Sequence, residues 1–306
     1  MPPVRRDARI LAVLLAVLAV LAVLAGCAAG PQERVATTNA VRVASYDFSE
    51  NQVLAEVYAL ALRRAGVPVT VAEGVGTREV VEPALEQGVV DVVIDYLGTA
   101  VDFVRPQGSS AGQSPDDLHA TLAHALGSRG VTVLEPSSAE DQNGFAVTTA
   151  FAAAHGVTGL SELAPLAHAL TLGAPPECPT RPLCLPGLRR VYGLDVAKVV
   201  PMPSRAATVE ALVAGQIDVG LLETTDARLA TTPLTLLTDD RGLQPHENVV
   251  PLVRSEILER WGDRAVTALD AASARLTTAA LVRLNRSVEV DGLTPARAAA
   301  RWWASG

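Results

Sequence analysis

Hydrophobic and polar positions in the first part of the chain alternate between short apolar runs and longer stretches with helical spacing. The apolar runs typical of strands cover residues 41–44, 67–72 and 89–96, and helical periodicity covers residues 49–65 and 77–87. Ser49 begins the first helix with capping-box spacing, and Gly66 ends it. This strand–helix–strand–helix–strand order predicts an α/β fold.

The remainder of the chain predicts a second α/β block and a helical tail. Helices are expected at residues 118–129 and 204–215, and strands at 131–134, 145–149, 217–222 and 234–238. Residues 244–251 are expected to form an extended connector, and residues 255–303 to be mostly helical with a break at 288–292.

The chain passes from the first predicted α/β block to the second near residues 141–144 and returns near residues 244–248. This spacing is typical of paired hinges. We therefore predict two lobes, the first made of residues 41–141 plus 247–306 and the second of residues 142–246. A chain that crosses twice between lobes leaves a cleft between them, which is a common position for small-molecule sites.

The N-terminus predicts export. Arg5, Arg6 and Arg9 precede an uninterrupted apolar run at residues 10–26, and the run closes on Cys27 after a small-residue pair. This ending resembles the bacterial lipobox, in which the cysteine is acylated and the chain is cut before it. An uncleaved membrane anchor is the alternative, although the run is short for a spanning helix. We expect a signal peptide at residues 1–26, a tether at residues 27–40 and a lipid anchor on the outer face of a membrane.

The two other cysteines, Cys178 and Cys184, lie six positions apart. In an exported protein such a pair is expected to form a disulfide. A metal site is disfavoured because no histidine lies near the pair, and a redox-active pair because the spacing is not Cys-x-x-Cys.

Charge and motifs exclude other functions. The full chain carries a net charge of −8, which becomes −10 without the signal peptide, so nucleic acid is not an expected partner. The common hydrolase, metalloprotease and phosphate-binding motifs are absent from the sequence. We therefore predict neither an enzyme nor a cofactor or metal requirement.

Several sequence blocks, in order, resemble the glycine betaine/choline substrate-binding lipoproteins of ABC importers. They are residues 45–51 (SYDFSEN), 76–81 (GTREVV), 95–100 (DYLGTA), 181–188, 192–194 (YGL), 211–219 (ALVAGQIDV), 225–226, 238–240 (TDD), 250–254 (VPLVR) and 284–288 (LNRSV). The resemblance covers about residues 41–303. It implies a two-lobed α/β fold of the periplasmic-binding-protein type (type II) with two hinge crossings. It also implies a small-molecule solute as ligand and a membrane permease as partner, and we expect the protein to act as a monomer.

Members of this family hold a quaternary ammonium group among tyrosine rings by cation–π attraction. The resemblance places Tyr96 at one box position, and Thr99 and Arg181 at positions that bind a carboxylate. Tyr46 stands where the family often has a lysine, and His246 stands where it has a further tyrosine. The box is incomplete, because Leu222 replaces another tyrosine and one is missing near residue 143. A different small polar or cationic solute is therefore the alternative ligand, and a lipid-tethered sensor is the alternative role.

Each candidate residue also has an ordinary structural explanation. Tyr96 could pack in the core, Thr99 could cap the helix that follows, Arg181 could be solvated, and His246 could lie on the surface. The loop that carries Tyr46, Asp47 and Ser49 could be a capped turn or an anion site at a helix N-terminus. Thr225 and Asp226 follow a strand and could form a turn, a helix cap or part of the ligand site.

Overall fold

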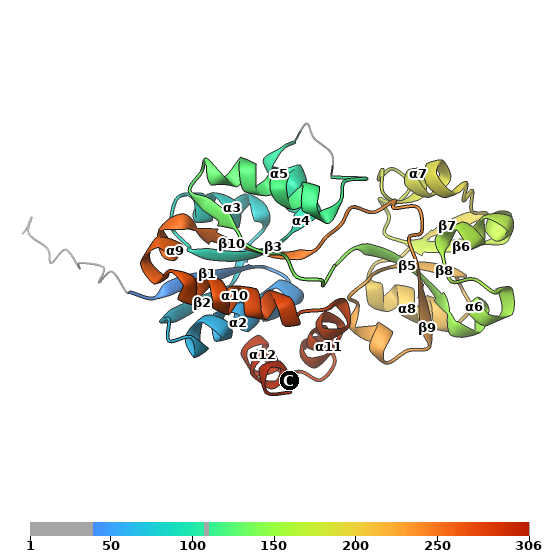
Figure 1. Ribbon diagram of the computed structural model, residues 1–306. Helices are drawn as coiled ribbons and strands as arrows, with labels where there is room; N and C mark the ends of the chain where they lie inside the picture. The colour runs from blue at the N-terminus through green and yellow to red at the C-terminus, as the bar shows by residue number, and fades with distance from the viewer. Residues whose placement is uncertain (1–38, 107–109, 306) are drawn as a thin grey trace, which may run out of the picture. The chain divides into compact units, whose positions relative to one another are not determined.

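The first of two sheets is built from both ends of the described chain (Figure 1). The structure, a computed structural model, describes residues 39–106 and 110–305. The strand order is β2-β1-β3-β10-β4, and β1 is parallel to β2 and β3, whereas β10 is antiparallel to β3 and β4. These strands are β1 (Val41–Tyr46), β2 (Val69–Gly76), β3 (Val92–Tyr96), β4 (Val131–Val133) and β10 (Val249–Arg254).

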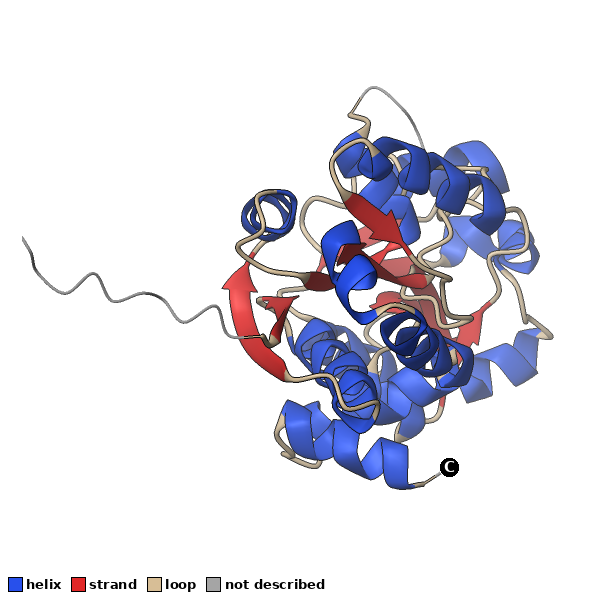
Figure 2. Cartoon of the chain, turned by 60° about the vertical axis from the view of Figure 1, so that its left-hand side comes forward, coloured by secondary structure: helices blue, strands red, loops and turns tan. Residues whose placement is uncertain are grey.

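Helices cover both faces of this sheet (Figure 2). Alternation along β1 explains this, because Val43 enters one hydrophobic cluster and Ala44 enters another. The cluster around Val43 includes the C-terminal helices, and the cluster around Ala44 includes the helices that follow β2 and β3. The helices are α2 (Ser49–Arg64), α3 (Arg78–Glu86), α4 (Leu97–Val104), α5 (Pro115–Gly127), α9 (Ser255–Trp261), α10 (Asp263–Arg275), α11 (Thr278–Glu289) and α12 (Pro295–Ala304).

The second sheet repeats this plan in the order β7-β6-β8-β5-β9. Strand β6 is parallel to β7 and β8, and β5 is antiparallel to β8 and β9. The strands are β5 (Asn143–Thr148), β6 (Thr171–Ala174), β7 (Lys198–Pro201), β8 (Val219–Glu223) and β9 (Leu234–Leu237). The helical segments are α6 (Thr149–His155), η1 (Leu160–Ala169), α7 (Leu185–Gly187), η2 (Leu188–Tyr192), α8 (Arg205–Val213) and η3 (Ala227–Ala230). We call the elements around the two sheets the first lobe and the second lobe.

Two antiparallel segments join the lobes. The N–H of Asp141 donates to the carbonyl of Glu247 at 3.2 Å, and the N–H of Val249 donates to the carbonyl of Ala139 at 2.9 Å. The crossing segments therefore form a short ladder, and the strand that receives each crossing, β5 or β10, is the antiparallel member of its sheet. The predicted two-lobed α/β fold with two crossings is confirmed.

Several local predictions were wrong. The expected connector at residues 244–251 ends in β10, a strand in the interior of the sheet, although Pro251 lacks an N–H group to donate. Its carbonyl still accepts from the N–H of Leu134 at 3.0 Å. Ser49 does not cap α2, because Phe48 is the N-cap residue and makes no side-chain cap hydrogen bond. Thr99 lies inside the first turn of α4 and not at its cap, which is Tyr96.

Candidate functional site

Three aromatic rings gather at the carboxyl edge of the first sheet. The ring centroid of Phe48 lies 6.1 Å from that of Tyr46 and 6.2 Å from that of Tyr96, and the planes are inclined by only 18° and 28°. Tyr46 and Tyr96 belong to hydrophobic clusters on different faces of the sheet. Phe48 contacts both because it follows the end of β1, beyond the sheet. Its side chain is exposed (41%), whereas both tyrosines are buried.

Carboxylates accept hydrogen bonds from both tyrosine hydroxyls. Tyr46 donates to Asp95 at 2.6 Å, and Tyr96 donates to Glu50 at 2.7 Å. Asp95 also holds the guanidinium of Arg78 in a two-point contact at 2.5 and 3.0 Å. Burial is the main reason that the pKa of each tyrosine is raised well above its usual value. The negative charge of Asp95 raises the pKa of Tyr46 further, and that of Glu50 raises the pKa of Tyr96. Both hydroxyls therefore remain protonated donors.

A buried polar network links this edge to the second lobe. Glu50 accepts from Asn285 of α11 at 2.6 Å, and the same amide donates to the carbonyl of Thr225 at 2.9 Å. The hydroxyl of Thr225 donates to Asp141 in the first crossing segment at 2.7 Å. Burial raises the pKa of Glu50. Burial also raises the pKa of Asp141 well above its usual value, and the nearby charge of Glu50 raises it further. The network therefore places two interacting carboxyl groups where the lobes meet.

The N-terminus of α4 binds the second crossing segment. The N–H groups of Leu97 and Gly98 donate to the carbonyls of Asn248 and His246. A side chain at position 98 would meet the His246 carbonyl oxygen at 2.9 Å, so only glycine allows this approach. These contacts hold the second crossing segment directly against the start of the helix.

The carboxylate of Glu247 accepts hydrogen bonds from Thr99, the next residue of this helix start. The N–H and hydroxyl of Thr99 donate to its carboxylate at 3.0 and 2.5 Å. Burial raises the pKa of Glu247 to about 7 against the opposing effect of these hydrogen bonds. The imidazole Nδ1 of the preceding His246 lies 3.2 Å from a carboxylate oxygen of Glu140. Thr99 and His246 are thus brought to the same place, and both already have partners within the protein.

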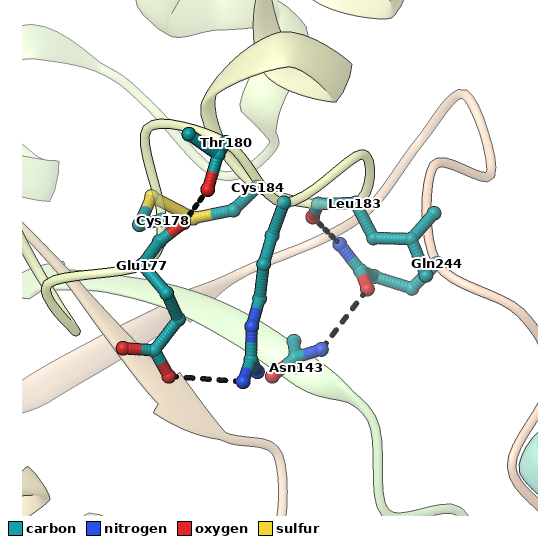
Figure 3. Close-up of a disulfide and its surroundings, with 8 residues drawn as sticks. Asn143, Glu177, Cys178, Thr180, Leu183, Cys184 and Gln244 are labelled. Atoms are coloured by element: carbon teal, nitrogen blue, oxygen red, sulfur yellow. Dashed lines mark hydrogen bonds and ion pairs between the residues drawn. A yellow bond between two sulfur atoms is a disulfide. The ribbon is translucent and has the colours of Figure 1, made fainter.

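Arg181 lies in a pocket of the second lobe, beside the disulfide. The predicted bond between Cys178 and Cys184 is present (Figure 3). Arg181 is exposed and pairs with Glu177 at 3.0 Å. The same pocket is lined by Arg205, which forms a 2.5 Å ion pair with Glu223.

Gln244 fastens this loop to the second crossing segment. Its side-chain amide donates to the carbonyl of Leu183 at 2.8 Å, and its oxygen accepts from Asn143 at 3.4 Å (Figure 3). The tertiary structure therefore ties the Arg181 loop to a segment that enters the first lobe. Tyr96 does not line the Arg181 pocket.

Three other candidates, Asp47, Ser49 and Asp226, lie apart from the ring cluster. Asp47 is exposed in the loop before α2, and the hydroxyl of Ser49 donates to Glu289 at 2.6 Å. Asp226 caps η3 by accepting from the N–H of Arg228 at 2.8 Å. None of these contacts joins the ring cluster.

The sequence reasoning missed Phe48, Glu50, Asn285 and Glu247 as parts of this site. The first two lie within the block at residues 45–51 that resembles the family, so their position was a usable signal. Asn285 lies in the block at residues 284–288, which gave the same kind of signal. Glu247 lies outside these blocks, and its partner Thr99 is distant along the chain.

Residues 39–106 and 110–305 contain no cluster of three or more His, Cys, Asp or Glu side chains arranged to hold a metal ion. Over the same ranges, no helix has the length and apolar character needed to cross a membrane. Cys27, the predicted signal peptide and most of the tether lie outside the described residues.

Comparisons with known proteins agree with this architecture. The model of the family described as the substrate binding domain of ABC-type glycine betaine transport system matches residues 39–305. A glycine-betaine-binding protein of Pseudomonas aeruginosa is 26% identical over 276 residues, which cover 87% of this chain and 88% of that protein. The glycine betaine-binding protein YehZ of Escherichia coli is 24% identical over 270 residues, covering 85% and 88%.

Solved structures share the fold. A glycine betaine/carnitine/choline ABC transporter structure superposes with a TM-score of 0.81 at 22% identity, covering 87% of this chain and 98% of that one. Apo YehZ from Escherichia coli gives a TM-score of 0.77 at 24% identity with the same coverage. Because the family model spans nearly all described residues, the chain belongs to the family of substrate-binding domains of ABC-type glycine betaine transport systems.

Proposed function

We propose that this protein binds a small quaternary ammonium solute between its two lobes and presents it to the permease of an ABC importer. The observation that carries the proposal is the exposed ring of Phe48, stacked beside Tyr46 and Tyr96 at the edge of the first sheet. Membership of the family makes the chain an extracytoplasmic solute-binding transport protein and not an enzyme.

The ring cluster suits a cation that cannot donate hydrogen bonds. Aromatic faces attract such a cation through the ring quadrupole. The hydroxyls of Tyr46 and Tyr96 each donate to a carboxylate, which increases electron density on their rings. Phe48 is the exposed member of the cluster, and the two tyrosines stacked beside it are buried.

The position of the cluster suits a protein that closes on its ligand. Tyr96 reaches the second lobe through Glu50 and Asn285, whose amide also binds the Thr225 carbonyl. A ligand held at Phe48 would therefore lie near the contacts that change when the lobes move. Contacts to both lobes would favour the closed state by population shift.

We further propose that acylation of Cys27 holds the exported protein on the outer face of the membrane as a monomer. We also propose that residues 41–141 plus 247–306 form the first lobe and that residues 142–246 form the second lobe. The N-terminal pattern of basic residues, apolar run and cysteine supports the anchor. The antiparallel crossing segments at 139–141 and 247–249 support the lobe boundaries.

Calorimetry of the mature protein with choline, glycine betaine, carnitine and 3,3-dimethylbutanol tests the ligand class. The last compound has the shape of choline but no charge. We expect at least one quaternary ammonium compound to bind and the neutral compound to bind far more weakly. Phe48→Leu should weaken binding of the cation by about 2- to 30-fold and leave the affinity for the neutral compound nearly unchanged. Phe151→Leu, in α6 of the second lobe, is the matched control. If no quaternary ammonium compound binds, the proposed function is wrong.

A further inference from the structure

The N-terminus of α4 already holds a carboxylate that belongs to the protein. Helix starts bind anions because their N–H groups lack partners within the helix. Here Leu97 and Gly98 donate to the second crossing segment, and Thr99 donates twice to Glu247. The exposed fraction of Glu247 is only 8%, so this carboxylate is built into the fold. A ligand carboxylate would have to displace it.

The guanidinium group beside the rings, that of Arg78, is also paired, because it holds Asp95. In the separate pocket of the second lobe, Arg181 holds Glu177 and Arg205 holds Glu223. The Arg78 pair is well buried, whereas the Arg181 pair is exposed on both sides and is the easiest to break. Each of these three guanidinium groups thus has an internal carboxylate as its partner.

The charge around the rings favours a cation. Glu50 and Asp95 accept from the tyrosine hydroxyls, and Glu247 interacts electrostatically with Asp95 and Arg78. Only one guanidinium, that of Arg78, stands among these three carboxyl groups in the described contacts. Acidic surroundings attract an ammonium group and repel a carboxylate.

From these three observations we infer that the site selects quaternary ammonium cations that lack a carboxylate, because Glu247 fills the carboxylate-binding position at the start of α4. Choline represents the selected class, and glycine betaine represents the rejected zwitterions. The inference rests on the proposed function, since it concerns the selectivity of the same site. Glu247 acts as a specificity-determining residue through the contact it makes with Thr99.

Competition between choline and glycine betaine tests the inference on the full mature protein. We expect the wild type to bind choline at least about tenfold more tightly than glycine betaine. Glu247→Gln keeps an oxygen for Thr99 but removes the charge, so it should lower this ratio severalfold, mainly by improving glycine betaine binding.

Glu86→Gln is the control, because it removes one exposed acidic charge whose partner is Arg129, a residue outside the site. It should leave the ratio of affinities unchanged. The inference is overturned if the wild type binds glycine betaine as tightly as choline, or if Glu247→Gln leaves the ratio of affinities unchanged. Binding of neither compound would instead contradict the proposed function.

Discussion

The hydroxyl of Tyr96 donates a 2.7 Å hydrogen bond to the carboxylate of Glu50, and both side chains are buried. This bond joins the end of β3 to the first turn of α2 across the carboxyl edge of the sheet. Glu50 also accepts from Asn285, whose amide contacts Thr225 of the second lobe. Tyr96 therefore supports both the aromatic cluster and the junction between the lobes.

Replacing Tyr96 with Phe should remove this bond and leave the ring in place. Because Glu50 then loses a donor in a buried environment, we expect the free energy of unfolding to fall by about 1–3 kcal/mol. The pKa of Glu50 should also rise further, since the hydroxyl stabilises its ionised form. Tyr58→Phe removes a bond to the neutral hydroxyl of Ser273 and should cost less. Urea denaturation measures the unfolding free energy of both variants. Equal losses would show that the charge of Glu50 does not strengthen its hydrogen bond with Tyr96.

The ion pair between Arg78 and Asp95 should contribute more to stability than an exposed pair. Arg78→Gln would leave the Asp95 carboxylate buried with Tyr46 as its remaining side-chain donor. We expect a loss of about 3 kcal/mol in unfolding free energy. Arg129→Gln removes the exposed pair with Glu86 and should cost roughly 0–1 kcal/mol. Thermal and urea unfolding compare the two, and a loss at Arg78 no larger than that at Arg129 contradicts this account.

Glu82 should make the protein less stable as the pH rises towards 8. Its side chain is buried in α3, and neither carboxyl oxygen has a hydrogen-bond partner among the described residues. Burial, then the charges of Asp95 and Glu86, raises its pKa from 4.5 to about 8. The folded state therefore holds a proton that the unfolded state has released. The contribution of Glu82 to the unfolding free energy is therefore fully present below pH 4.5 and is lost as the pH rises through about 8.

Glu82→Gln isolates this effect. Between pH 5 and pH 8 the unfolding free energy of the wild type should fall by roughly 2–4 kcal/mol more than that of the variant. Denaturant titrations at several pH values measure both slopes. Glu79→Gln, at an exposed position of the same helix, is the control and should leave the slope unchanged. Parallel slopes for the wild type and Glu82→Gln would mean that Glu82 is ionised in the folded protein at pH 5.

The disulfide should stabilise the second lobe and the Arg181 loop. The loop that it closes is short, because the two cysteines are separated by six positions. Replacing both cysteines with Ser should lower the unfolding free energy by about 2 kcal/mol. Reductant should destabilise the wild type by a similar amount and leave the double variant unaffected. A wild type indifferent to reductant, with two reactive thiols, would show that the bond does not form in the exported protein.

Much of the fold could be predicted from local pattern. Periodicity located β1, α2, β3, α5 and α8 within a few residues, because the spacing of apolar side chains directly reflects which face is buried. The close cysteine pair also predicted the disulfide. Strand β10 was missed because Pro251 argues against an interior strand, and its pairing with β3 and β4 becomes visible only in the sheet.

By itself the sequence determined the α/β class, the double crossing and the aromatic residues at the ends of β1 and β3. These features depend on short-range spacing and on motifs that lie together in the chain. Only the tertiary structure decided that Phe48 stacks beside both tyrosines, that Asn285 reaches Glu50 over 235 positions, and that Glu247 accepts from Thr99. Such pairings arise because folding buries polar groups from distant segments together, and most buried polar groups then pair with one another in space.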